Sequence, residues 1–230
     1  MSAHLNLGNS IFKGFNDQNG ILICGYEHGE SKADVAKYEA NKTQKISHPN
    51  KDEVTFTFAN KEPFLGKYSF PYDSRIATWF RLWGHPLNHD GLGDDFTKSI
   101  MQTNLSNTQS NHVQDYDVIA SGFDNFVELL KELKPSLILF MGVRNSDFIN
   151  KPDNLSKIEN ILGQSIAGRK SVTAETSGRK FRVIFQDFEH CHTVTFPHPS
   201  GTIGLTNEYI SKFEPQLNEI LTKYKAQRGF

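Results

Sequence analysis

Apolar residues occur along the chain in short runs separated by amphipathic stretches, and the two patterns predict different elements. Residues 21–24 and 137–141 are continuously apolar, and each run ends in a glycine. Such runs are typical of strands buried on both faces of a parallel sheet. Alternation of apolar and polar residues predicts half-buried strands at 54–58, 181–185 and 193–196. Residues 96–105 are a weaker strand candidate that runs into a polar loop at 106–111.

Helices are predicted where apolar residues recur at spacings of three and four. Such stretches cover residues 75–83, 118–133, 155–163 and 206–224. Asp73 and Ser74 precede the first as capping residues, and Pro215 kinks or restarts the last. The Gly/Ser/Thr-rich segment 168–180 is predicted to be a loop or hairpin. Because helices and strands alternate, we expect a three-layer α/β/α sandwich around a mainly parallel sheet of about four strands, in one domain spanning residues 1–230.

The amino-acid composition limits the classes of protein to which the chain can belong. No apolar run approaches the length of a membrane span, and residues 1–6 lack the features of a secretory signal. Two cysteines, Cys24 and Cys191, are too few for a disulfide framework. We therefore expect a cytoplasmic monomer without a membrane partner. With 25 basic and 26 acidic residues, contact with nucleic acid requires a local basic patch.

Polar residues follow three of the predicted strands, where ligands bind in open α/β sheets. Glu27 and His28 lie in the glycine-bracketed loop 25–29, Asn104 lies near the end of the middle strand, and His198 lies between two prolines. Carboxylate, amide and imidazole groups are the usual acid-base and recognition groups of active sites. The structural alternatives are a solvated turn for the loop, a turn residue for Asn104 and a helix cap for His198.

The order of these segments resembles the uracil-DNA glycosylase superfamily. Its members carry a Gly-x-(acid or Asn)-Pro-(Gly or Tyr) loop early, an Asn after a middle strand and a His-Pro-Ser loop late. The matching segments here are Gly25-Tyr26-Glu27-His28-Gly29, Thr103-Asn104 and His198-Pro199-Ser200-Gly201. Pro63-Phe64-Leu65-Gly66 is similar to a segment of the iron-sulfur class, and Lys134-Pro135 before the strand at 137–141 is similar to another family block. The resemblance spans residues 21 to about 205.

The resemblance implies a uracil-DNA glycosylase-like fold and a monofunctional hydrolase of base-excision DNA repair. This glycosidase would cleave the N-glycosidic bond of uracil, or a related deaminated base, in damaged DNA and leave an abasic site. Glu27 would stabilise the oxocarbenium-like sugar and orient the attacking water, and His198 would stabilise the departing base anion. Asn104 would read the Watson-Crick edge of uracil, with Phe64 and Tyr26 in the base-binding site.

Other residues would contact the DNA under this interpretation. The loop and DNA contacts would come from His28, Pro199, Ser200 and Gly201, because a stiff loop can press against the opened strand. Phosphate contacts would come from basic residues in the predicted loop or hairpin: Arg169, Lys170, Arg179 and Lys180.

The chain also departs from the family pattern, as a divergent member would. His28 replaces the loop proline, and an insertion at about 39–62 lengthens the chain between the first two motifs. The cluster-binding cysteines of the iron-sulfur class are absent, so the resemblance implies no cluster and no cofactor. A zinc site formed by His190, His192 and Cys24 is a weaker alternative, since no typical ligand spacing supports it.

Two other functions remain open. A superfamily member with altered loops can bind a nucleobase, a nucleotide or a protein partner without cleavage. A nucleotide or nucleoside hydrolase would use the same pocket without a DNA groove. A basic groove around His198 favours the DNA enzyme, whereas a neutral or acidic groove favours the binding module.

Overall fold

The structure is a computed structural model that describes most of the chain. The described residues are 16–26, 28–29, 36, 40, 56–57, 71–88, 90, 93–106, 109–110, 116–176 and 178–230. For residues 28–29, 56–57, 109–110, 116–119 and 121, the description is limited to the backbone.

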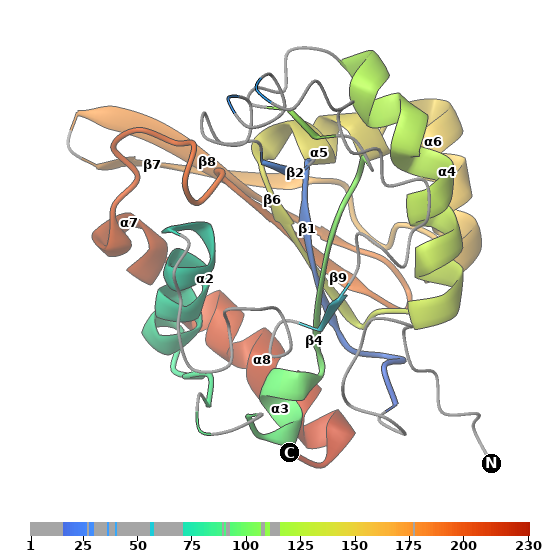
Figure 1. Cartoon of the computed structure of the whole chain (residues 1–230). Coiled ribbons are helices and arrows are strands. Elements are labelled where there is room, and N and C mark those ends of the chain that lie inside the picture. Colours follow the sequence, from blue (N-terminus) through green and yellow to red (C-terminus); the bar gives the residue numbers. More distant parts are fainter. Residues whose placement is uncertain are drawn as a thin grey trace.

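A mixed, mostly parallel sheet flanked by helices forms the centre of the molecule (Figure 1). Its strands follow the order β3-β4-β1-β6-β9-β8-β7, of which β4, β1, β6 and β9 are parallel to one another. The strand bounds are β1 Ile21–Gly25, β3 Phe56–Thr57, β4 Ile100–Asn104, β6 Leu137–Met141, β7 Lys170–Thr176, β8 Arg179–Asp187 and β9 His192–Phe196. A separate parallel pair joins β2 (His28–Gly29) to β5 (Gln109–Ser110). The α/β class is therefore confirmed.

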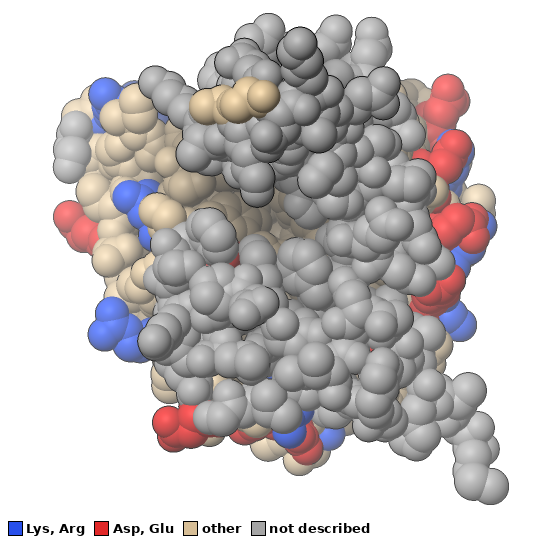
Figure 2. All heavy atoms as spheres, viewed as in Figure 1, with Lys and Arg blue, Asp and Glu red and all other residues tan. Residues whose placement is uncertain are grey.

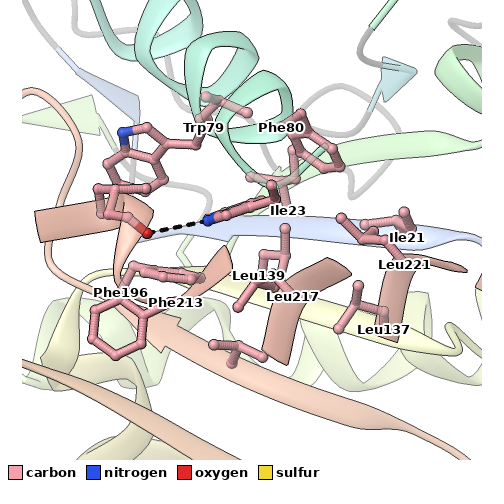
Figure 3. Packing of buried hydrophobic residues seen from close by; sticks show 14 of the residues in the cluster. Ile21, Ile23, Trp79, Phe80, Leu137, Leu139, Phe196, Phe213, Leu217 and Leu221 are labelled. Atoms are coloured by element: carbon pink, nitrogen blue, oxygen red, sulfur yellow. Dashed lines mark hydrogen bonds between the residues drawn. The ribbon is translucent and has the colours of Figure 1, made fainter. Parts of the chain in front are cut away.

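Helices cover both faces of this sheet, and each face has its own apolar core. The helices are α2 Pro71–Leu82, α3 Asp95–Lys98, α4 Tyr116–Leu133, α5 Val143–Ile149, α6 Pro152–Leu162, α7 Asn207–Ser211 and α8 Glu214–Arg228. Successive side chains of β1 point to opposite faces, so Ile21 and Ile23 join one core while Leu22 and Cys24 join the other. Figure 3 shows side chains of β1 meeting those of α2 and α8 in the first core. This burial on both faces explains why β1 and β6 are continuously apolar.

Several predicted elements differ from those observed. The stretch 96–105 divides into α3 and β4, because the Asp94 side chain accepts a hydrogen bond from Thr97 N at 2.8 Å and caps a short helix first. Segment 168–180 forms most of an antiparallel hairpin, β7–β8, and β8 pairs with β9. The prediction of about four strands is wrong for this reason, since the hairpin and the two-residue β3 extend the four parallel strands.

The α2 helix also begins earlier than predicted. It begins at Pro71, so Asp73 lies inside its first turn and does not cap it. Within the described part of the chain, no helix combines the length and apolar character needed to cross a bilayer.

Candidate functional site

The carboxyl ends of the parallel strands meet at one edge of the sheet. Gly25 at the end of β1 is in register with Asn104 at the end of β4, and Met141 of β6 is in register with Phe196 of β9. Leu105 N continues the pairing beyond β4 by donating to the Gly25 carbonyl at 3.0 Å. The segments that follow these strands therefore start from one side of the molecule, as in other open α/β sheets.

His198 lies between two tyrosine rings at this edge. Tyr26 is nearly parallel to its imidazole, with an interplanar angle of 6° and 6.1 Å between ring centroids. Tyr72, from the first turn of α2, is tilted by 47° with 5.3 Å between centroids. The Tyr26 hydroxyl accepts a hydrogen bond from Arg144 N at 2.9 Å, and its ring lies against Gly142, where a Cβ would overlap it. The aromatic surroundings shield the imidazole from solvent.

The hydrogen bonding of His198 fixes which ring nitrogen carries the proton. Gly201 N donates to His198 Nδ1 at 3.0 Å, so the neutral imidazole carries its proton on Nε2 and presents Nε2–H as a donor. Burial lowers the pKa of His198 to about 4, because desolvation disfavours the imidazolium form. At neutral pH the residue is an uncharged hydrogen-bond donor.

Two arginines brace the loop that carries His198. Arg75 of α2 donates from Nη1 to the Pro199 carbonyl at 2.6 Å. Arg179 of β8 donates from Nη1 to the Ile203 carbonyl at 2.7 Å, and a Cβ at Gly204 would come within 2.9 Å of its Cδ. The loop is thereby held from the helix on one side and from the hairpin on the other.

Asn104 is positioned by its register with Gly25. A Cβ at position 25 would overlap Asn104 Oδ1, so the amide occupies space that only glycine leaves free. The Tyr72 hydroxyl lies 3.6 Å from that same Cβ position. Tyr72 therefore lies near both the Asn104 side and the His198 side of the candidate site.

Tyr72 and Asp73 are two residues that the sequence analysis did not assign to the site. Burial, and secondarily the nearby Cys24 and Asp73, raise the pKa of Tyr72, and a hydrogen bond with Gln102 opposes that shift. Asp73 is fully buried and accepts from Gln102 Nε2 at 3.4 Å. A usable signal was a tyrosine and a carboxylate at the start of a helix that is otherwise apolar on its inner face.

The other predicted site residues are placed as follows. Pro199 is buried, whereas Ser200 and Gly201 are exposed on the turn after β9. The backbone of His28 lies in β2. Glu27 and Phe64 lie outside the described residues.

A cavity of about 410 Å³ lies beside His198. The His198 side of its wall includes Tyr26, Val143, Pro197 and Thr202. The wall on the hairpin side consists of Thr173, Lys180, Phe181 and Arg182. This wall combines aromatic surface with hydroxyl groups and two cationic side chains, a lining that suits a planar, anionic ligand.

The sequence alternative of a zinc site gains no support from the described residues, where no three His, Cys, Asp or Glu side chains lie together as metal ligands. His192 Nδ1 instead contacts Asp187 Oδ1 at 2.7 Å across β8 and β9. Cys24 and Cys191 are buried free thiols.

Comparison of the sequence with protein-family models and with curated proteins finds no match.

Proposed function

We propose that the protein is a DNA glycosylase that hydrolyses the N-glycosidic bond of uracil, or of a related deaminated base, and leaves an abasic site. The observation that carries this proposal is His198, a neutral imidazole between Tyr26 and Tyr72 whose Nδ1 accepts from Gly201 N. The reaction needs a hydrogen-bond donor beside the leaving base, because negative charge develops on a base oxygen as the bond breaks.

In the proposed reaction, the bonding electron pair leaves with the base, and His198 Nε2–H donates to the base oxygen that gains charge. Water adds to the sugar carbon, and its proton passes to a general base. Glu27 is proposed for this base because it directly follows Tyr26 in the sequence. The reaction as written requires no cofactor.

Asn104 is proposed to select the base. Its amide offers one acceptor and two donor hydrogens, and uracil presents an N–H donor beside its carbonyl acceptors. Cytosine presents the reversed pattern at the corresponding positions, so a fixed amide disfavours it. The crowding of Asn104 Oδ1 against Gly25 supports this role, since it restricts where the amide can lie.

The loop after β9 is proposed to contact the opened DNA. Ile203 is 77% exposed, and Arg179 holds its carbonyl. An apolar side chain presented in this way can fill the space that a flipped nucleotide leaves in the stack. Ser200 and Gly201, exposed on the same loop, are proposed to contact the backbone.

The direct test is to incubate the protein with end-labelled single-stranded and double-stranded DNA that contains one uracil, and then to cleave abasic sites with alkali. We expect cleavage at the uracil position and none in a matched thymine strand. Asn104→Asp should reduce uracil excision and admit some cytosine, whereas Asn207→Asp on the exposed start of α7 should leave both unchanged. Nucleobase binding without cleavage of any deaminated base would contradict the proposal and favour the binding module.

Glu27→Gln tests the proposed base separately. We expect single-turnover excision to fall by roughly 10²- to 10⁴-fold, the range for loss of a positioned acid-base group. Glu208→Gln, at an exposed position of α7, is the matched control and should retain full activity. If His28 has taken over the chemistry, Glu27→Gln is mild and His28→Pro abolishes cleavage.

A further inference from the structure

Positive charge is concentrated in one short segment of a chain whose total charge is close to zero. The whole sequence has 25 basic and 26 acidic residues. Residues 169–182 contain five basic residues and a single acidic one, Glu175. The basic residues are Arg169, Lys170, Arg179, Lys180 and Arg182. Figure 2 shows Lys and Arg side chains along the side of the molecule on which Figure 1 places β7 and β8.

The two faces of the hairpin differ in character. Val172, Ala174 and Phe181 pack against the apolar core that includes α7. The cross-strand pairs Thr173–Arg182 and Glu175–Lys180 alternate with these positions, so their side chains point to the opposite face. Thr173, Lys180 and Arg182 are exposed there.

The basic residues of this segment have different partners. Arg169 and Arg182 each contact one oxygen of Asp147 at 2.9 Å, so a single carboxylate is shared by two cations. Arg179 is engaged with the Ile203 carbonyl. Among the described residues, neither the Lys170 nor the Lys180 side chain forms an ion pair or a hydrogen bond. The hairpin therefore retains net positive charge after its internal contacts are counted.

This charged face is continuous with the candidate site. The cavity of about 410 Å³ has His198 and Tyr26 in one part of its wall and Thr173, Lys180 and Arg182 in another. When the target nucleotide of a DNA strand lies beside His198, the phosphates on either side of that nucleotide are one backbone repeat away. Cations and hydroxyl groups are the usual partners of such phosphates.

From this arrangement we infer that the outward face of the β7–β8 hairpin binds the phosphodiester backbone of DNA beside the target nucleotide, with Lys180 and Arg182 as its phosphate contacts. The inference rests on the proposed function for the identity of the ligand. It assigns Asp147 of α5 a supporting role, since its carboxylate contacts Arg182 directly, while Arg169 contacts the other oxygen of the same carboxylate.

The test measures binding of the intact protein to a fluorescent, uracil-free single strand of about 15 nucleotides by anisotropy, between about 50 and 200 mM salt. Each lost phosphate contact lowers the slope of log affinity against log salt by about 0.7 for single strands. We expect Lys180→Gln and Arg182→Gln each to lower the slope by roughly this amount, and the double variant by about twice as much. Lys223→Gln, on an exposed part of α8, should not change it.

Two results would overturn the inference: no binding of DNA by the wild-type protein, or salt slopes of the hairpin variants equal to that of Lys223→Gln. Failure of the proposed function has a different signature, namely absence of alkali-labile sites in uracil DNA.

Discussion

The two polar groups at the carboxyl edge of the sheet are held in different ways. Asn104 ends β4, and its position depends on strand register and on the absence of a side chain at Gly25. His198 lies on a loop, and its position depends on Tyr26, Tyr72 and the two arginines that bracket the loop. A side chain on a strand is positioned by pairing with one neighbouring strand, whereas a side chain on a loop is positioned by contacts from several distant segments.

This contrast predicts which substitutions would displace each group. The loop has redundant support, so the loss of one brace leaves the others in place. The Asn104 amide lies tightly against Gly25, so one added methyl group at position 25 displaces it. The predictions below test this difference, beginning with removal of the imidazole itself.

Replacement of His198 by Ala should have the largest effect of these substitutions. Loss of one preorganised donor to a developing anion typically costs about 10²- to 10³-fold in rate. We expect that loss in single-turnover excision, with a normal circular dichroism spectrum. His192→Ala serves as the control because that residue is exposed and paired with Asp187 away from the loop. Wild-type excision by His198→Ala would remove the imidazole from the reaction.

The next largest effect is expected from Gly25→Ala. The new Cβ overlaps Asn104 Oδ1, so the amide must move, and a misplacement of about 1 Å can cost roughly 10²-fold. Excision of uracil should fall by about 10- to 100-fold, with some loss of discrimination against cytosine. Gly168→Ala is the matched control, because a Cβ there meets no atom within 4 Å. Equal rates for the two variants would show that the Gly25–Asn104 contact does not position the base.

A single brace of the loop should matter less. Arg75→Met removes the hydrogen bond to the Pro199 carbonyl and leaves the Arg179 contact with Ile203 intact. We expect excision to fall by about tenfold or less, through looser positioning of His198. Arg81→Met, on the exposed part of the same helix, should behave as wild type. A loss as large as that of His198→Ala would mean that the braces are not redundant.

The last prediction concerns the pH dependence of stability rather than the rate of excision. The pKa of His198 is about 4 in the folded protein and about 6.5 in the unfolded chain. The unfolded chain therefore binds more protons between these values, and the contribution of His198 makes the fold less stable as pH falls through this window. Between pH 7 and pH 5 the loss is about 2 kcal/mol.

The measurement is urea unfolding of wild type and of His198→Gln at both pH values. The variant should lose less stability on acidification than wild type does. Titration of the imidazole by NMR gives the folded pKa directly, and a value near 6.5 would contradict the partly buried, neutral donor.

The sequence predicted those features that depend on local pattern. Continuous apolar runs identified β1 and β6, and recurrence at three and four identified α4 and α6. The pattern also predicts Asn104 and His198, together with Glu27, as polar groups at strand ends, because a strand that stops in glycine or proline exposes the next side chains at the edge of a sheet. Local backbone chemistry is sufficient for such predictions.

Other features required the tertiary structure. Tyr72 and Asp73 were not predicted as part of the site, because their proximity to Cys24 and Gln102 follows from the packing of α2 across the sheet. Which basic residues contact Asp147, which one contacts the Ile203 carbonyl and which line the cavity also depends on how the hairpin folds against α5 and the loop.

By itself, then, the sequence determined the α/β class and which residues could end strands as polar groups, since both follow from hydrophobic periodicity and turn residues. The tertiary structure decided which groups meet. The tautomer of His198, the confinement of Asn104 by Gly25 and the charged face beside the cavity depend on contacts between segments far apart in the chain. Burial and hydrogen bonding set the protonation state of a side chain, and both depend on neighbours that local sequence does not specify.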